Sequence, residues 1–131
     1  MGDPTTTINE HLIRRDFRDV NTNQLYSLVY ISGTCLPRFF GHTDDRWHEF
    51  DLDIFVAPNV RWRSIFDATV TVTPAAVEVD GGETGWAVNL SKFERRNDQL
   101  VLIASCALRG WVSLHRLNYS AVVNGLILSH T

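Results

Sequence analysis

The run from residue 97 to 125, NDQLVLIASCALRGWVSLHRLNYSAVVNG, constrains the fold more than any other part of the chain. It contains no proline, and between residues 100 and 108 both alternating sets of positions are apolar or small. Apolar residues on both faces are typical of a strand that is covered on both sides. The run therefore predicts a central strand over residues 100–108.

The chain is predicted to turn back at Arg109-Gly110, which makes residues 97–125 a β-hairpin. Successive side chains alternate between the two faces of a strand, so one face of the returning strand takes every second residue. The more apolar of the two sets is Trp111, Ser113, His115, Leu117, Tyr119, Ala121 and Val123.

Further strands precede this hairpin, since apolar and polar residues alternate between turn residues. The predicted strands are 25–34, 50–56, 60–73, 77–79 and 86–90, with Phe66 on the inward face of the third. Residues 36–46 are predicted as loop, Pro74 as a strand end, Asp80-Gly81-Gly82 as a turn, and 92–98 as a charged turn. The alternation predicts a core of Phe50, Leu52, Ile54, Trp62, Val70, Val88, Leu102, Ala104, Leu117 and Ala121.

Six to eight closely spaced strands without helical periodicity after residue 20 indicate an all-β fold. We predict an antiparallel β-sandwich formed by a single domain over residues 25–131. Residues 1–24 are more polar and are predicted to be a short N-terminal arm, in which Thr5, Thr6 and Thr7 would cap a short helix over residues 8–13.

Composition narrows the classes of function. The 131 residues are 44% hydrophobic and 21% charged, as in soluble globular proteins, and no apolar run reaches the roughly 18 residues that a membrane helix needs. A net charge of −3 argues against a dedicated nucleic-acid binder. The first residues lack the pattern of a classical secretion signal, and the compartment is not indicated.

No motif points to catalysis, to a cofactor or to a specific metal site. His42, Asp44, Asp45 and His48 could hold a metal ion if they converged, but four polar residues in one loop are more typical of a solvated surface. Ser105, His115 and Asp98 supply the residue types of a catalytic triad without its sequence context. We expect a protein that is not an enzyme.

Cys35 and Cys106 lie 71 residues apart and form no CxxC pair. By spacing alone they are either a disulfide or two core thiols.

Four tryptophans are many for a chain of this length, and an aromatic ring beside polar residues is suited to the apolar face of a sugar. Trp62 lies on the inward face of its predicted strand. Trp47, Trp86 and Trp111 lie at strand ends beside loops and are the candidates for binding.

The order of features from Tyr30 to Val123 resembles the H-type lectin family, the six-stranded sandwiches of snail agglutinins and discoidin C-terminal domains. Ser32-Gly33 followed by Cys35 looks like the opening strand of that family, and TVTVTPAAVEVD like its central strand and acidic tail. NLSKFERRNDQLVLIASC is similar to its strand, turn and apolar strand, and VSLHRLNYSAVV to its last strand.

This resemblance implies a glycan-binding module that assembles as a trimer or a multiple of it, with a disulfide between Cys35 and Cys106. In the family, a Trp-His or similar pair and then a Tyr follow the second cysteine, together with an Arg from the preceding strand and an Asp from the first long loop. Here Trp111 is displaced and has no adjoining His, Ser113 falls near the Tyr place, Trp86 near the Arg place, and Asp44 or Asp45 could stand for the loop Asp.

The predicted sugar site consists of Trp111 and Arg109 in the turn, with Trp86 and Asp45 approaching from neighbouring loops. The simpler interpretation is that Trp111 covers the end of the sandwich and Arg109 pairs with a carboxylate. Two other functions fit the same pattern. One is a structural β-sandwich that joins subunits in a larger particle or fibre, and the other is a small-ligand barrel or barrel enzyme with a closed apolar cavity.

Overall fold

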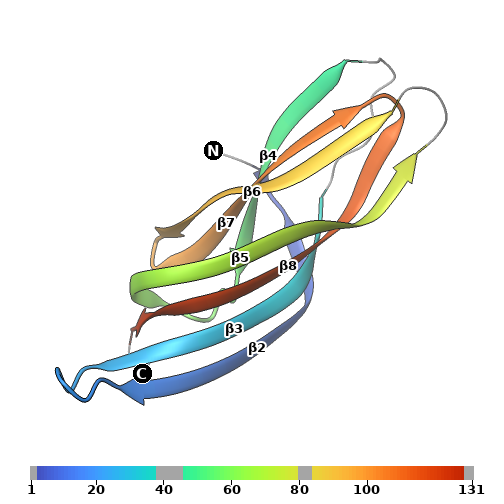
Figure 1. Ribbon diagram of the computed structural model, residues 1–131. Coiled ribbons are helices and arrows are strands. Elements are labelled where there is room, and N and C mark those ends of the chain that lie inside the picture. The colour runs from blue at the N-terminus through green and yellow to red at the C-terminus, as the bar shows by residue number, and fades with distance from the viewer. Residues whose placement is uncertain (1–2, 38–45, 80–83, 129–131) are drawn as a thin grey trace.

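The computed structural model describes residues 3–37, 46–79 and 84–128, and the described chain is built from β-strands. The strands are β1 (Asp3–Pro4), β2 (Thr6–Arg18), β3 (Leu25–Leu36), β4 (Trp47–Val56), β5 (Trp62–Val79), β6 (Gly85–Arg96), β7 (Gln99–Arg109) and β8 (Val112–Ile127). They form two four-stranded sheets packed as a β-sandwich, so the predicted fold class is confirmed (Figure 1). No described helix is long and apolar enough to span a bilayer.

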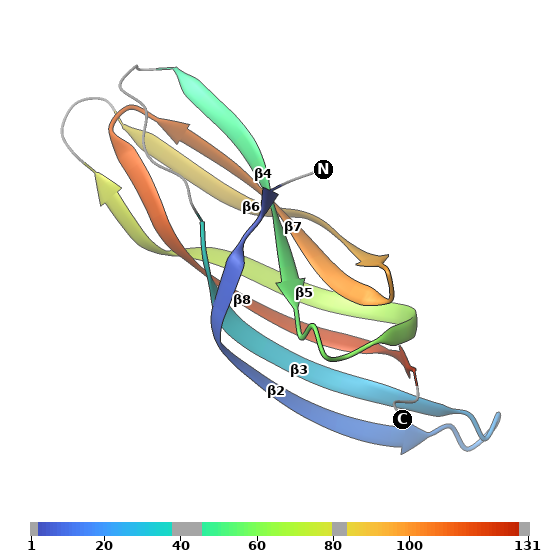
Figure 2. The same cartoon turned by 180° about the vertical axis from the view of Figure 1, so that it is seen from behind.

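The first sheet has the strand order β1-β4-β7-β6, and the second has the order β2-β3-β8-β5. All neighbours pair in antiparallel fashion except β1, which runs parallel to β4 (Figure 2). The two sheets remain separate instead of closing into a barrel. β7 and β8 are therefore interior strands, one in each sheet.

The predicted hairpin of β7 and β8 is wrong, because these two strands lie in different sheets. Gly110, with φ of 72°, turns the chain from one sheet to the other. The hairpin of this region joins β6 to β7 instead, through Asn97 and Asp98, whose φ angles of 51° and 65° suit the tight turn that antiparallel strands prefer. The predicted charged turn over 92–98 is accordingly shorter, and residues 92–96 belong to β6.

The core between the sheets contains the residues that alternation predicts. Seven of the ten predicted core residues are buried, and Phe50, Val70 and Val88 are partly buried against them. β7 is buried on both faces, as predicted, since Val101 and Ile103 on its outer face are covered as well. A bridge from β6 to β4 passes over this face, in which Arg96 Nη1 donates to Asp53 Oδ2 at 2.7 Å and Arg96 Nε and Nη2 donate to Glu94 Oε1.

β-Bulges explain why some side chains that were predicted to point inward are exposed. Phe66 was predicted to point inward but is exposed, because it is the extra residue between the pairs Ile65–Gly125 and Asp67–Asn124. Pro74 does not end its strand, since β5 continues to Val79 across two further shifts in register.

These register shifts reverse which side chains point inward in the first part of β8. Val112 and Leu114 are buried, whereas Trp111 and His115, which were predicted to point inward, are exposed. From Leu117 to Val123 the predicted inward set is correct.

The predicted short helix near the N-terminus is also wrong, because residues 8–13 belong to β2, which pairs along β3. A bulge follows Ile8, where Asn9 has φ of 54° and Glu10 turns inward. The Glu10 carboxylate accepts a hydrogen bond from the Tyr119 hydroxyl at 2.6 Å and from the Ala57 N–H at 3.0 Å. This carboxylate ties β2 to β8 and to the start of the β4–β5 connection.

Candidate functional site

Three exposed tryptophans gather at the end of the sandwich where β4 and β6 begin and where β7 turns into β8, at the upper right of Figure 1. Trp47, Trp86 and Trp111 expose 51%, 46% and 53% of their surface. Trp62, predicted to be core, is fully buried. Exposed aromatic groups clustered at one end of a domain are more typical of a binding surface than of solvated loops. We name this surface, formed by Trp47, Trp86, Arg109 and Trp111, the tryptophan end.

Strand register fixes the relative positions of two residues of the tryptophan end, Trp47 and Arg109. Arg109 on β7 is the register partner of Trp47 on β4 and of Gly85 on β6. The indole of Trp47 extends over β7 as far as β6, because an added Cβ at Gly85 would lie 2.7 Å from Cη2 of that ring. The absence of a side chain at Gly85 thus lets the Trp47 ring lie across the end of the sheet, next to the strand position of Arg109.

The other two tryptophans reach the same end from β6 and from the turn after β7. Trp86 is the partner of Leu108, whose side chain is in the core, so Trp86 lies at the mouth between the sheets. Trp111 lies on the turn that joins the sheets, directly before Val112. The structure therefore brings Trp86, Arg109 and Trp111 to one end, as predicted, and adds Trp47, which sequence analysis named only as a candidate. Asp45 lies outside the described residues.

The His/Asp cluster that sequence analysis considered falls mostly outside the described residues. Of its four members the structure describes His48, on β4, and the described residues contain no group of three or more potential metal ligands. The three residues with the side-chain types of a catalytic triad do not come together in the structure. Asp98 lies in the β6–β7 turn at one end of the sandwich, Ser105 lies within β7, and His115 lies near the start of β8 at the other end.

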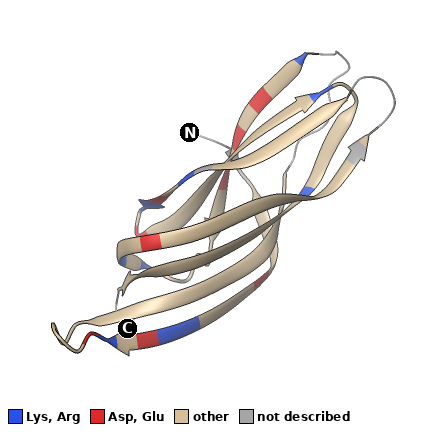
Figure 3. Ribbon diagram, in the orientation of Figure 1, with Lys and Arg blue, Asp and Glu red and all other residues tan. Residues whose placement is uncertain are grey.

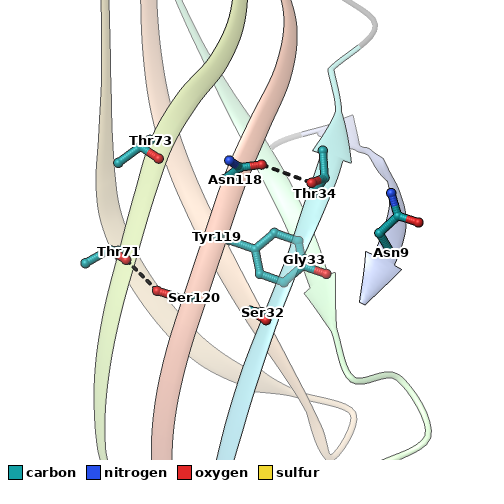
Figure 4. A pocket seen from close by; sticks show the side chains of 9 residues that line it. All are labelled: Asn9, Ser32, Gly33, Thr34, Thr71, Thr73, Asn118, Tyr119 and Ser120. Carbon is teal, nitrogen blue, oxygen red and sulfur yellow. Dashed lines mark hydrogen bonds between the residues drawn. The ribbon is translucent and has the colours of Figure 1, made fainter. Parts of the chain in front are cut away.

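A hollow that the sequence did not predict lies on the outer face of the second sheet and has a volume of about 370 Å³ (Figure 4). Two rows of small polar side chains line it. Thr34, Asn118 and Thr73 are register partners, as are Ser32, Ser120 and Thr71. The Thr34 hydroxyl donates to Asn118 Oδ1 at 2.9 Å, and the hydroxyls of Thr71 and Ser120 lie 2.7 Å apart.

The lining of this hollow is uncharged, and its floor is closed by Gly33, beneath which the Tyr119 ring passes. The alternation of threonine in TVTVTP is the sequence signal for one wall. The other walls come from strands far away in the chain, so the hollow could not be located before the pairing of β3 with β8 was known.

Cys35 and Cys106 are free thiols, both buried, so the disulfide that the resemblance implies is not formed in this structure. They face the core from opposite sheets. Burial raises the pKa of Cys35 from the ordinary 9.0 to about 11. For Cys106, burial first and then the nearby Cys35 raise the pKa to about 12.

These two pKa values predict how stability responds to alkali. Well below pH 9 the thiols are protonated in both states, and as pH rises through 9.0 the unfolded chain loses their protons first. The free energy of unfolding is therefore expected to fall as pH rises from about 9 toward 12. Urea unfolding at pH 8, 9.5 and 10.5 measures this slope, and the Cys35→Ala/Cys106→Ala variant should show a smaller one. An equal slope in the variant would contradict the assignment.

Comparison with known proteins gives no relative: no family model matches the chain, and neither a curated protein nor a solved structure is similar to it.

Proposed function

We propose that this protein is a non-catalytic glycan-binding module whose sugar site is the tryptophan end. The observation that carries the proposal is that three tryptophans, each about half exposed, lie with Arg109 at one end of the sandwich. Indole rings offer flat apolar surfaces to the C–H faces of a sugar, and a guanidinium offers several donors to its hydroxyls. All four residues belong to strand ends or to a two-residue turn, so little chain entropy is lost when a ligand binds.

The buried residues on either side of the turn also support the proposal. The core residues Leu108 and Val112 flank the turn that carries Trp111, and both are fully buried. A ring anchored between two buried strands is held in place before the ligand arrives. A single shallow site of this kind binds weakly, and we propose that the protein acts as an oligomer that presents several sites to one glycan surface. The trimer, or a multiple of it, that the lectin resemblance implies remains a prediction.

Replacing Trp111 with alanine tests the site. Glycan binding, screened on an array and then measured by calorimetry, is expected to weaken by at least about tenfold, because the ring supplies stacking area that no neighbour replaces. The melting temperature should change by less than about 3 °C, since half of the ring is already in solvent.

The matched control is Phe66→Ala, which removes an equally exposed ring from β5 and should leave glycan binding unchanged. If Trp111→Ala lowers the melting temperature by several degrees while glycan binding persists, Trp111 is a structural lid and the site assignment is wrong. If the unmodified protein binds no glycan on the array, the proposed function itself is wrong.

A structural role in a larger assembly is the second candidate. It is favoured by the apolar side chains that remain exposed on the outer face of the second sheet, among them Ile13, Tyr30 and Val122. Electron microscopy of concentrated protein distinguishes the two functions, because an assembly protein forms extended particles or fibres without any glycan.

A further inference from the structure

The middle of the outer face of the second sheet is apolar. Ile13, Tyr30 and Val122 are register partners across β2, β3 and β8, and they expose 59%, 43% and 37% of their surface. They line a shallow hollow of about 200 Å³ together with Ile31 and Ala121. Farther along β2 and β3, Phe17 stacks on Tyr26 with ring centroids 5.4 Å apart. The solvent face of an antiparallel sheet is ordinarily polar, so this apolar row indicates a covered surface.

The face is large enough for a specific interface. Four strands at a spacing of roughly 4.8 Å give a width of about 19 Å, and the 12 residues of β3 span about 40 Å. The projected area of roughly 760 Å² is close to the ~800 Å² per partner of a standard protein–protein interface.

Opposite charges mark the two edges of the same face. In the row next to the apolar one, Arg15 on β2, Leu28 on β3, Asn124 on β8 and Asp67 on β5 are register partners. Arg15 and Asp67 are exposed, and neither makes a hydrogen bond or an ion pair with the described part of the chain. Figure 3 shows the basic segment on β2 and the acidic position on β5, on the two outermost strands of the sheet.

We propose that this face binds a second copy of the chain, around a twofold axis that runs parallel to the strands between β3 and β8. Such an axis lays β2 of one copy over β5 of the other, and β3 over β8. Arg15 of each copy then meets Asp67 of the other, so the dimer contains two equivalent charge pairs. This inference is independent of the proposed sugar site, which lies at the end of the sandwich.

The charges also select this axis over the alternative. A twofold axis running across the strands would lay β2 over β2 and β5 over β5, so Arg15 could not meet Asp67 of the other copy. With the axis parallel to the strands, Tyr30 of one copy lies over Val122 of the other at the centre of the apolar row, and Ile13 lies over Thr69 at its edge. Two sheets packed face to face keep their strands within about 30° of each other, which this axis permits.

Sedimentation equilibrium of the full chain, with the mass checked by light scattering, tests the proposal. The unmodified protein is expected to contain an even number of chains, as a dimer or as a hexamer built from dimers. Arg15→Asp and Asp67→Arg are each expected to weaken the dimer by about 100-fold, because each replaces two attractive pairs with two repulsive ones. The double variant, which restores opposite charges in exchanged positions, is expected to dimerise again.

Lys92→Asp is the matched control, since it makes the same change of charge as Arg15→Asp on an exposed residue of the other sheet and should leave the mass unchanged. Circular dichroism confirms that each variant is folded. A monomer at 100 μM, a trimer, an open polymer, or a double variant that remains as weak as the single ones would overturn the proposal.

Discussion

Asp53→Ala is expected to lower the free energy of unfolding by about 3 kcal/mol, because it removes one partner of a buried ion pair. Asp53 is only 1% exposed and accepts a hydrogen bond from Arg96 at 2.7 Å across the central strand β7. Without the carboxylate, the Arg96 guanidinium, about three-quarters buried, loses one of its two acidic partners and keeps Glu94 as the other.

Urea unfolding measures this effect, and two variants serve as controls. Lys92→Ala removes an exposed pair with Glu94 at 3.9 Å and should cost less than about 1 kcal/mol. Asp53→Leu/Arg96→Met replaces both charges with apolar groups and should recover much of the lost stability, because it leaves no unpaired charge. Were Asp53→Ala to behave like Lys92→Ala, the bridge over β7 would be irrelevant to stability.

Gly125→Ala is expected to cost about 3 kcal/mol or to prevent folding. An added Cβ would lie 2.3 Å from the Ser64 carbonyl oxygen and 3.1 Å from the Ile65 Cα. These are backbone atoms of the bulged part of β5, so relief requires the pairing of β5 with β8 to open. The loss is measured as a fall in the midpoint of thermal or urea unfolding.

Gly85→Ala provides the comparison for this substitution. Its added Cβ would contact the outer atoms of the Trp47 ring, which is exposed and can move aside, so the expected cost is below about 1 kcal/mol. Equal losses at the two glycines would show that the contact of Gly125 with the β5 backbone is unimportant.

Alternation predicted the strands whose pairing is regular and failed where a bulge adds a residue. β4 pairs with β7 without interruption, and its inward residues Leu52 and Ile54 are buried as predicted. Phe66 looks like a core residue in the sequence, but its direction depends on a bulge that only the pairing with β8 defines. β2 escaped recognition because it is an edge strand that is exposed on both faces over much of its length, so no alternation is imposed on it.

The candidate site was likewise predictable only where the signal is local in the sequence. Trp86, Arg109 and Trp111 could be assigned to strand ends from turn residues nearby in the sequence, and the strand ends do meet at one end of the sandwich. The contact between Asp53 and Arg96, residues 43 positions apart, depends on which strand lies between β4 and β6. Local sequence carries no information about that order, because strands far apart in the chain become neighbours only in the sheet.

The strand order also has a consequence for biosynthesis. β7 joins β4 to β6, and β8 joins β3 to β5, so the first sheet is not continuous until β7 has been translated and the second is not continuous until β8 has been translated. A nascent chain that has reached Asp98 has made β3, β4, β5 and β6 but lacks the strands that pair between them, and it exposes unpaired apolar edges. Ribosome-bound intermediates of this protein are therefore expected to depend on chaperones until residue 127 has left the exit tunnel.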